Sequence, residues 1–174
     1  MRYLEIRRHS MRVKPGKHLS QAGVMLARRT GEGRGPFDRV VTSDLPRAFE
    51  TAIAMGFAVD EQMKDLASFD DEVDAEISNP ADLQSVVRAV RRGKAAGKLS
   101  KRLSKLMHSL AVSIPDGGNA LVITHGTLLE LCAIGCLPEA DHTSWGATFG
   151  STSVSRITSD KIILLDKWNI YFLD

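Results

Sequence analysis

The sequence predicts a three-layer α/β/α fold with a mostly parallel central sheet. Two observations support this fold class. Short apolar segments typical of strands alternate with longer segments of helical periodicity, and residues 120–124 form an apolar run of the kind that parallel sheets bury on both faces. The 174 residues, 43% of them hydrophobic and 25% charged, suffice for a sizeable core. We therefore expect residues 1–174 to form a single domain.

The first two predicted strands are each followed by a helix. Residues 3–6 alternate in polarity and predict a short strand, and Ser20 then caps a helix that the glycine-rich residues 31–36 end. Residues 39–42 are rich in β-branched side chains and predict the second strand. The second helix has Pro46 in its first turn, where a helix tolerates proline.

The middle of the chain is less regular. Residues 60–82 are acidic and predict a loop or insertion with short helical pieces. From residue 83 to residue 110, apolar side chains recur every three to four positions, which predicts helix. Glycines at positions 93 and 97 are expected to divide this helical stretch in two.

The last part of the chain begins with the apolar strand 120–124. A helix follows directly, and we expect Gly135 to end it. Residues 153–158 and 161–168 predict two further strands. The apolar residues 170–173 are a candidate edge strand for pairing with a second copy of the chain, so a homodimer stays open at this level.

Charge is distributed in blocks along the chain. Residues 60–82 carry nine acidic and one basic side chain, whereas residues 83–115 carry eight basic and no acidic ones. Because residues 83–115 also lack aromatic side chains that would stack on bases, we do not expect a nucleic acid partner. A solvated helical face is the first interpretation of the basic block, and a patch that gathers acidic substrates is the alternative.

The compartment is predicted from the first residues and the cysteines. Charged side chains near the start, including Arg2 and Glu5, occupy positions where a signal peptide is apolar, so we expect a cytoplasmic protein. Cys132 and Cys136 lie in an apolar segment and are expected to be buried, reduced thiols. No apolar run is long enough to predict a membrane partner.

Polar side chains of similar kind follow three of the predicted strands. Arg8 and His9 follow the first strand, Arg47 follows the second, and His125 follows the third. Because ligands bind beyond the carboxyl ends of parallel strands, we expect these side chains to share one pocket. Guanidinium groups and imidazoles together form an anion site, and they point to phosphate. Arg7, beside Arg8, is expected to be solvated on the opposite strand face.

Four segments of the chain resemble, in order, the signatures of the histidine phosphatase superfamily, phosphoglycerate-mutase-like branch. They are IRRHS at 6–10, LSQAG at 19–23, VTSDLPRAFETA at 41–52 and VITHG at 122–126. The resemblance implies a phosphoglycerate-mutase-like fold in which residues 60–115 form a variable acidic and basic insertion over the active site. It also implies a phosphatase that hydrolyses phosphomonoesters with neither a metal nor another cofactor.

The resemblance also implies catalytic roles. His9 would attack phosphorus and become a phosphohistidine, while Arg8, Arg47 and His125 would hold the phosphoryl oxygens. A further group of residues would bind substrate: Arg12, Ser10 and Gly126. Ser10 stands where the family usually has glycine.

The general acid is the point at which the chain departs from the family pattern. The branch usually places Glu two residues after a Leu, whereas this chain has Ser68 two residues after Leu66. The acidic candidates nearby are Asp65, Asp70, Asp71 and Glu72. We assign the role to Asp70, the first carboxylate beyond the expected position.

Three functions remain open at this level. The first is a phosphatase for small phosphorylated substrates, and the second is a protein phosphohistidine phosphatase with a phosphoprotein partner. The third is a phosphate-binding module with weak turnover, which the serine at position 68 suggests. A mutase is disfavoured, because the short span from Ser10 to Leu19 leaves little room for a longer substrate-binding stretch.

Overall fold

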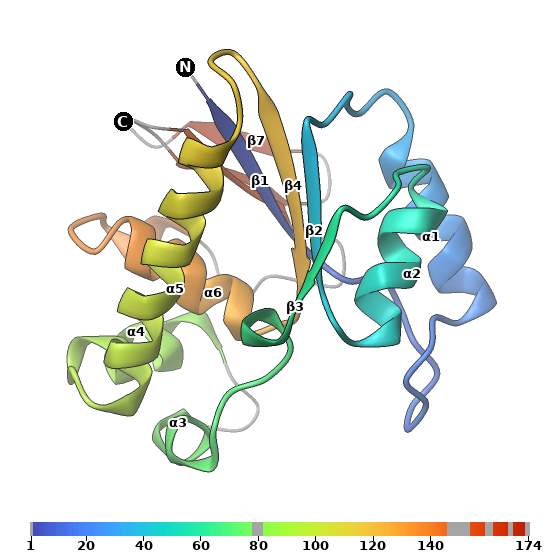
Figure 1. Cartoon of the computed structure of the whole chain (residues 1–174). Helices are drawn as coiled ribbons and strands as arrows, with labels where there is room; N and C mark the ends of the chain where they lie inside the picture. Colours follow the sequence, from blue (N-terminus) through green and yellow to red (C-terminus); the bar gives the residue numbers. More distant parts are fainter. Residues whose placement is uncertain (1, 78–81, 146–153, 159–161, 167–168, 173–174) are drawn as a thin grey trace.

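The structure is a computed structural model that describes residues 2–77, 82–145, 154–158, 162–166 and 169–172. Seven strands form one sheet, and helices cover both of its faces (Figure 1). The strands are β1 (Tyr3–Arg8), β2 (Arg39–Ser43), β3 (Glu61–Met63), β4 (Asn119–Thr124), β5 (Val154–Thr158), β6 (Ile162–Asp166) and β7 (Asn169–Phe172). The helices are α1 (Gln21–Gly31), α2 (Pro46–Ala54), α3 (Asp71–Glu76), α4 (Leu83–Arg91), α5 (Ala95–Ser113) and α6 (Leu128–Cys136), with 3-10 turns η1 (Lys64–Leu66) and η2 (His142–Trp145). The three-layer α/β fold is confirmed.

The sheet has a parallel part and an antiparallel part. Its strand order is β3-β2-β4-β1-β5-β6-β7; β3, β2, β4 and β1 run parallel, and the last three strands are antiparallel. The expected tail strands correspond to β5 and β6, although residues 153, 161, 167 and 168 lie outside the described residues. β7 lies at the edge of the sheet, where an edge strand was expected, and residue 173 lies outside the described part.

Strand β4 is buried on both faces, as its apolar sequence predicts. Leu121 and Ile123 pack with α1 and α2 on one side, whereas Ala120 and Val122 belong to the larger core beneath α5 and α6. Arg7 on β1 is also buried, and its guanidinium forms an ion pair with Glu5. The expectation of a solvated Arg7 is therefore wrong, because covering both faces of the sheet buries the polar as well as the apolar side of β1.

The local signals for the first two helices are confirmed. The Ser20 hydroxyl accepts a hydrogen bond from the Gly23 backbone N–H at 3.0 Å, which caps α1. Pro46 occupies the first turn of α2, and the helix ends before Gly56, whose φ is +95°. Ser20 and Pro46 therefore mark the starts of α1 and α2, as the sequence predicts.

Residues 60–115 contain parts of the domain framework. β3 extends the sheet by pairing with β2, and α5 packs against α6 in the larger core. The expected break at Gly93 is confirmed, since its φ of +71° lies between α4 and α5. The expected break at Gly97 is wrong, because Gly97 lies within α5.

Gly135 does not end α6, which continues to Cys136. A Cβ at this position would lie 2.3 Å from the Ser100 carbonyl oxygen on α5. The glycine therefore permits the close approach of two helices.

We expect Gly135→Ala to lower the free energy of unfolding by about 1–3 kcal/mol, because backbone must move to admit the methyl group. Urea unfolding followed by circular dichroism measures this change. A variant as stable as the parent chain would show that α5 and α6 are not held at this spacing.

Candidate active site

The carboxyl ends of the parallel strands β1, β2 and β4 lie side by side, as predicted. In the parallel register, Arg8 on β1 lies opposite Thr124 on β4, and Thr42 on β2 lies opposite Ile123. The His9 backbone N–H donates to the Thr124 carbonyl at 2.9 Å, which extends the pairing by one step. His9 and His125 therefore leave adjacent strands side by side, with their ring centroids 4.9 Å apart.

The ring of His9 is held with one nitrogen facing the arginines. Its Nδ1 lies 2.6 Å from the Ser10 carbonyl oxygen, which can only accept, so Nδ1 carries the proton. Its Nε2 accepts a hydrogen bond from Nε of Arg47 at 3.1 Å. Burial, together with the positive charges of Arg47, Arg8 and Arg12, lowers the pKa of His9 to about 4. At neutral pH the imidazole is thus uncharged, with the lone pair on Nε2.

His125 is neutral for similar reasons. Burial, followed by the neighbouring His9 and the arginines, lowers its pKa to about 3. Its Nε2 lies 2.7 Å from the hydroxyl oxygen of Ser43, the last residue of β2. Ser43 therefore orients the second imidazole.

Three guanidinium groups surround the two histidines. Arg8, Arg12 and Arg47 each lower the pKa of both imidazoles, so all three lie within electrostatic reach of them. Burial, and then Arg12 and Arg8, also lowers the pKa of Arg47 itself. Within the described residues, the groups that shift these pKa values electrostatically are arginines and a histidine, and no carboxylate is among them. A phosphoryl dianion bound there would neutralise the positive charge of the guanidinium groups.

Because Gly126 has no side chain, the guanidinium group of Arg8 packs directly against the backbone at that position. A Cβ on Gly126 would be 2.8 Å from Cζ of Arg8, which shows how closely the guanidinium packs there. Ser10 is buried, and its hydroxyl donates to the Gly23 carbonyl oxygen at 2.7 Å. The side chain that replaces the family's usual glycine thus links the loop to α1.

Sequence reasoning missed the contacts by which α2 holds the loop after His9. The Thr51 hydroxyl accepts from the Ser10 N–H at 3.0 Å and donates to the Arg47 carbonyl oxygen at 2.6 Å. Thr51 follows Arg47 by four residues, one helical turn, and this spacing is the signal that was available. Ser10, and through it the ring of His9, is therefore fixed to the helix that carries Arg47.

Glu50, the residue before Thr51 on α2, anchors the far end of the same loop. Residues 12–19 form a hairpin-like turn with a bridge between Arg12 and Leu19. The Glu50 carboxylate accepts from the Leu19 N–H at 2.7 Å and from Nδ1 of His18. Although partial burial raises the pKa of Glu50, these hydrogen bonds outweigh it and keep the pKa below its ordinary value. Glu50 and Thr51 together hold the turn that carries Arg12.

We expect Glu50→Gln to raise the Kd for inorganic phosphate about two- to fivefold, because loosening the turn releases Arg12. Isothermal titration calorimetry measures the change. His18→Ala, which leaves the bond to Leu19 in place, is expected to have a smaller effect. Equal affinity in Glu50→Gln and the parent chain would mean that the turn does not position Arg12.

The acidic candidates lie in segments next to the strand ends. The Thr124 hydroxyl donates to the Leu66 carbonyl oxygen at 2.7 Å, which ties η1 to the end of β4. Asp70 follows as the exposed N-cap residue of α3, and within the described part of the chain no contact joins it to either histidine. Asp65 lies 3.8 Å from Arg102. The structure therefore brings together Arg8, His9, Arg12, Arg47 and His125, with no carboxylate beside the two histidines among the residues that it describes.

Comparisons with known proteins give a match to one protein family. A family model described as the histidine phosphatase superfamily (branch 1) matches residues 7–170. No curated protein sequence matches the chain. Among the helices in the described residues, none has both the length and the apolar character that crossing a bilayer requires.

Solved structures with the same fold include three with named activities. A mycobacterial glucosyl-3-phosphoglycerate phosphatase has a TM-score of 0.62 at 21% identity, covering 89% of each chain. A phosphoserine phosphatase from Entamoeba histolytica, in complex with 3-phosphoglyceric acid, has a TM-score of 0.64 at 14% identity, covering 100% of this chain and 96% of that one. A phosphoglycerate mutase from Bacillus anthracis has a TM-score of 0.59 at 17% identity, covering 98% and 90%.

Proposed function

Because this chain belongs to the histidine phosphatase superfamily, we propose that it hydrolyses phosphomonoesters through a phosphohistidine on His9. The observation that carries the proposal is the geometry of His9. Its Nδ1 is held by Ser10, and the lone pair on its Nε2 accepts a hydrogen bond from Nε of Arg47, which a bound phosphoryl group would displace. A neutral imidazole among guanidinium groups can attack the phosphorus of an anion that those groups bind.

The reaction has two steps. In the first, Nε2 of His9 forms a bond to phosphorus while the bond from phosphorus to the leaving oxygen breaks, and that oxygen takes up a proton. In the second, water attacks phosphorus, the P–N bond breaks, and inorganic phosphate leaves with His9 neutral again. Arg8, Arg12, Arg47 and His125 stabilise the negative charge of the phosphoryl oxygens in both transition states.

Asp70 remains our proposed proton donor to the leaving oxygen. The bond between Thr124 and Leu66 brings the chain that leads to Asp70 to the end of β4. The test compares Asp70→Asn with the parent chain on two substrates. Hydrolysis of an alkyl phosphate, a poor leaving group, is expected to fall more than hydrolysis of p-nitrophenyl phosphate. An equal effect on both substrates would remove Asp70 from this role.

A protein phosphohistidine substrate is the second candidate. The observation that favours it is the absence of a carboxylate contact at His9 and His125 among the described residues. An imidazole leaves from phosphorus more readily than an alkoxide, so it needs less help from an acid. Comparing kcat/KM for a phosphohistidine protein and for small phosphate esters separates the two candidates.

We also propose that the enzyme is cytoplasmic. Cys132 and Cys136 are free thiols, as proteins of the reducing cytoplasm have.

The direct test is hydrolysis of p-nitrophenyl phosphate in the presence of EDTA. We expect turnover with chelator present and, after rapid alkaline quenching with a radiolabelled phosphoryl donor, label on His9. Phosphate binding without hydrolysis or labelling would instead support a binding module and overturn the proposal.

The pH dependence follows from the lowered pKa of His9. The imidazole must be unprotonated to attack, so the active form is present above a pKa of about 4 and is lost as the pH falls through that value. An NMR titration of the His9 ring is therefore expected to show its midpoint near 4. A midpoint at the ordinary value of 6.5 would contradict the buried, arginine-facing geometry.

A further inference from the structure

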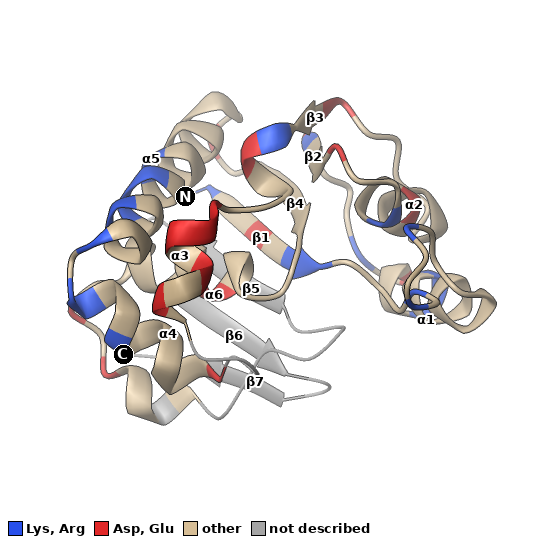
Figure 2. Ribbon diagram, turned by 90° about the horizontal axis from the view of Figure 1, so that it is seen from below, with Lys and Arg blue, Asp and Glu red and all other residues tan. Residues whose placement is uncertain are grey.

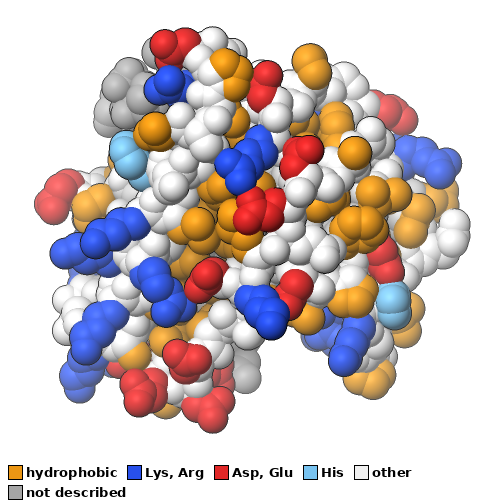
Figure 3. Space-filling view, viewed as in Figure 1, with side chains coloured by type: hydrophobic (Ala, Val, Ile, Leu, Met, Phe, Trp, Pro, Cys, Tyr) orange, Lys and Arg blue, Asp and Glu red, His pale blue; other side chains and the backbone are white. Residues whose placement is uncertain are grey.

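A row of basic side chains runs along α4 and α5, outside the group of residues that surrounds His9. All of its members are exposed, and no acidic residue interrupts the sequence from 83 to 115. We call this surface the basic ridge; it consists of Arg88, Arg91, Arg92, Lys94, Lys98, Lys101, Arg102 and Lys105. Figure 3 shows Lys and Arg side chains gathered over α4 and α5, at the left of the view.

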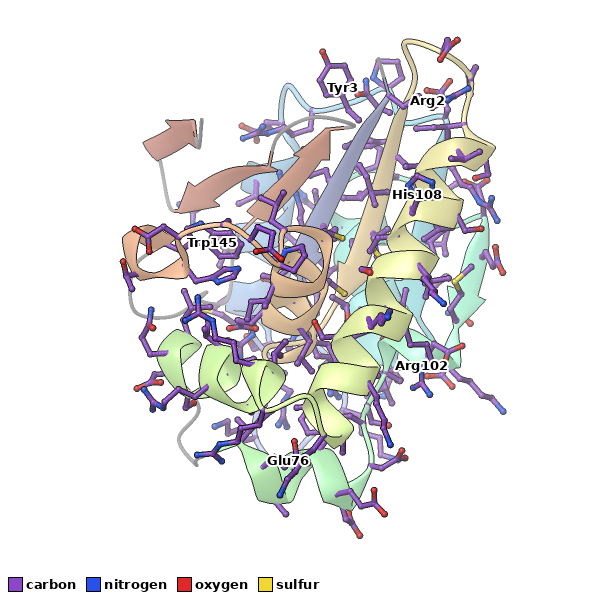
Figure 4. The ribbon with its side chains drawn as sticks, turned by 90° about the vertical axis from the view of Figure 1, so that its left-hand side faces the viewer. Arg2, Tyr3, Glu76, Arg102, His108 and Trp145 are labelled. Carbon is purple, nitrogen blue, oxygen red and sulfur yellow. The ribbon has the colours of Figure 1, made fainter. Side chains whose placement is uncertain are left out.

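The backbone beneath the basic ridge is held in place, because the opposite side of α5 packs in the core. Leu99, Leu103 and Met107 are buried beneath the helix. The four lysines recur at intervals of four, three and four residues, so they form one stripe on the outer side, about 16 Å long. Figure 4 shows Arg102 and His108 projecting from the outer side of α5. The positive charges are thus spaced in a fixed pattern.

Few acids compensate these charges. Within the described ranges, Arg102 is the only member of the ridge in an ion pair, with exposed Asp65 at 3.8 Å. Arg91 is a minor contributor to the lowered pKa of Asp141, behind the hydrogen bonds from Thr143. The other members lack a carboxylate partner in the described structure, so the ridge attracts anions from outside the chain.

An acidic helix borders the ridge and makes it narrow. α3 packs against α5, and the Glu76 carboxylate accepts from the backbone N–H groups of Ala95 and Ala96 at 2.9 and 3.1 Å. The exposed acids of α3, Asp71, Glu72 and Asp74, therefore stand beside the basic stripe, as Figure 2 shows. A broad anionic surface that covered the basic ridge would also contact the carboxylates of α3, which would repel it.

From this juxtaposition we propose that the basic ridge docks an acidic segment of another protein. A single helix or extended segment is narrow enough to contact the lysine stripe without facing α3. Glu or Asp side chains three to four residues apart on a helix match the spacing of the lysines. A membrane or a nucleic acid duplex presents a broader field of negative charge, and residues 83–115 have no aromatic side chain for stacking on single strands.

The docking is independent of chemistry at His9. It requires only α4 and α5, so a catalytically dead chain is expected to bind the same segment with the same affinity. Failure of the proposed hydrolysis therefore leaves this proposal standing, and failure of docking leaves the hydrolysis standing.

The test measures binding of a fluorescent helical peptide with Glu at alternating three- and four-residue intervals. Fluorescence anisotropy with the full chain at low salt is expected to show binding that weakens as salt rises. The variant Lys98→Glu, Lys101→Glu, Lys105→Glu is expected to lose about tenfold or more in affinity. The control, Arg28→Glu, Arg29→Glu, Arg34→Glu, makes the same change of net charge around α1, on the other side of the sheet, and is expected to bind like the parent chain.

Circular dichroism melting confirms that both triple variants are folded. Equal loss in the two variants would show attraction by net charge alone and overturn the proposal. A duplex RNA and phosphatidylserine vesicles are measured in parallel, and both are expected to bind more weakly than the peptide. Tighter binding of either one by the parent chain would overturn the choice of a protein segment.

Discussion

Replacing His9 with alanine is expected to lower kcat/KM for p-nitrophenyl phosphate by at least about 10³-fold, because the group that forms the P–N bond is gone. The arginines and His125 remain in the variant, so binding of inorganic phosphate is expected to persist. Steady-state kinetics and calorimetry measure the two effects separately. The combination of lost turnover and retained binding identifies His9 as a catalytic residue rather than a structural one.

His108→Ala is the matched control for this experiment. His108 is exposed on α5, and it is expected to be dispensable for turnover. If His9→Ala retained the parent activity, the phosphohistidine mechanism would be wrong, whatever residue then performed the hydrolysis. Loss of both turnover and phosphate binding would point to collapse of the site, and a melting curve tests for that.

The carboxyl ends of the parallel strands could be predicted because short-range patterns determine them. The apolar run of β4 ends where His125 begins, and β1 ends directly before His9, so the sequence places both imidazoles at one edge. The N-cap at Ser20 and the proline at the start of α2 are also local, and both were predicted from neighbouring residues.

The contacts that were missed join residues far apart in the chain. The bond of Thr51 to the Ser10 N–H and that of Glu50 to the Leu19 N–H arise only when α2 packs beside the loop after β1. Likewise, Gly135 has the composition of a helix end, but its role depends on the Ser100 carbonyl of another helix. Sequence periodicity carries no information on such distances, so it located the reacting groups but not the contacts that position them.

The three residues of β3 show the same limit. Glu61, Gln62 and Met63 are too few and too polar to predict a strand, and they become one because β2 offers a free edge beside them. Their pairing with β2 places the start of the acidic segment next to the strand ends.

Removing Arg47 is expected to change both the rate and the titration of His9. Its Nε donates to Nε2 of His9, and its charge is the largest electrostatic contribution from an arginine to the lowered pKa of that ring. We expect Arg47→Ala to lower kcat about 10²- to 10³-fold, as loss of one donor to a developing oxyanion does. Because burial and positive charge both decrease, the pKa of His9 is expected to rise from about 4 toward its ordinary value.

Arg47→Lys separates charge from geometry. Lysine keeps a positive charge near His9 but lacks the fork of donors, so the pKa of His9 is expected to stay low while kcat is only partly restored. The NMR titration of the ring and the acid limb of the rate profile report the same protonation. In Arg47→Ala both are expected to move to higher pH, since less positive charge opposes protonation. An unchanged pKa together with lost activity would mean that Arg47 acts only on the substrate, and that burial alone keeps His9 neutral.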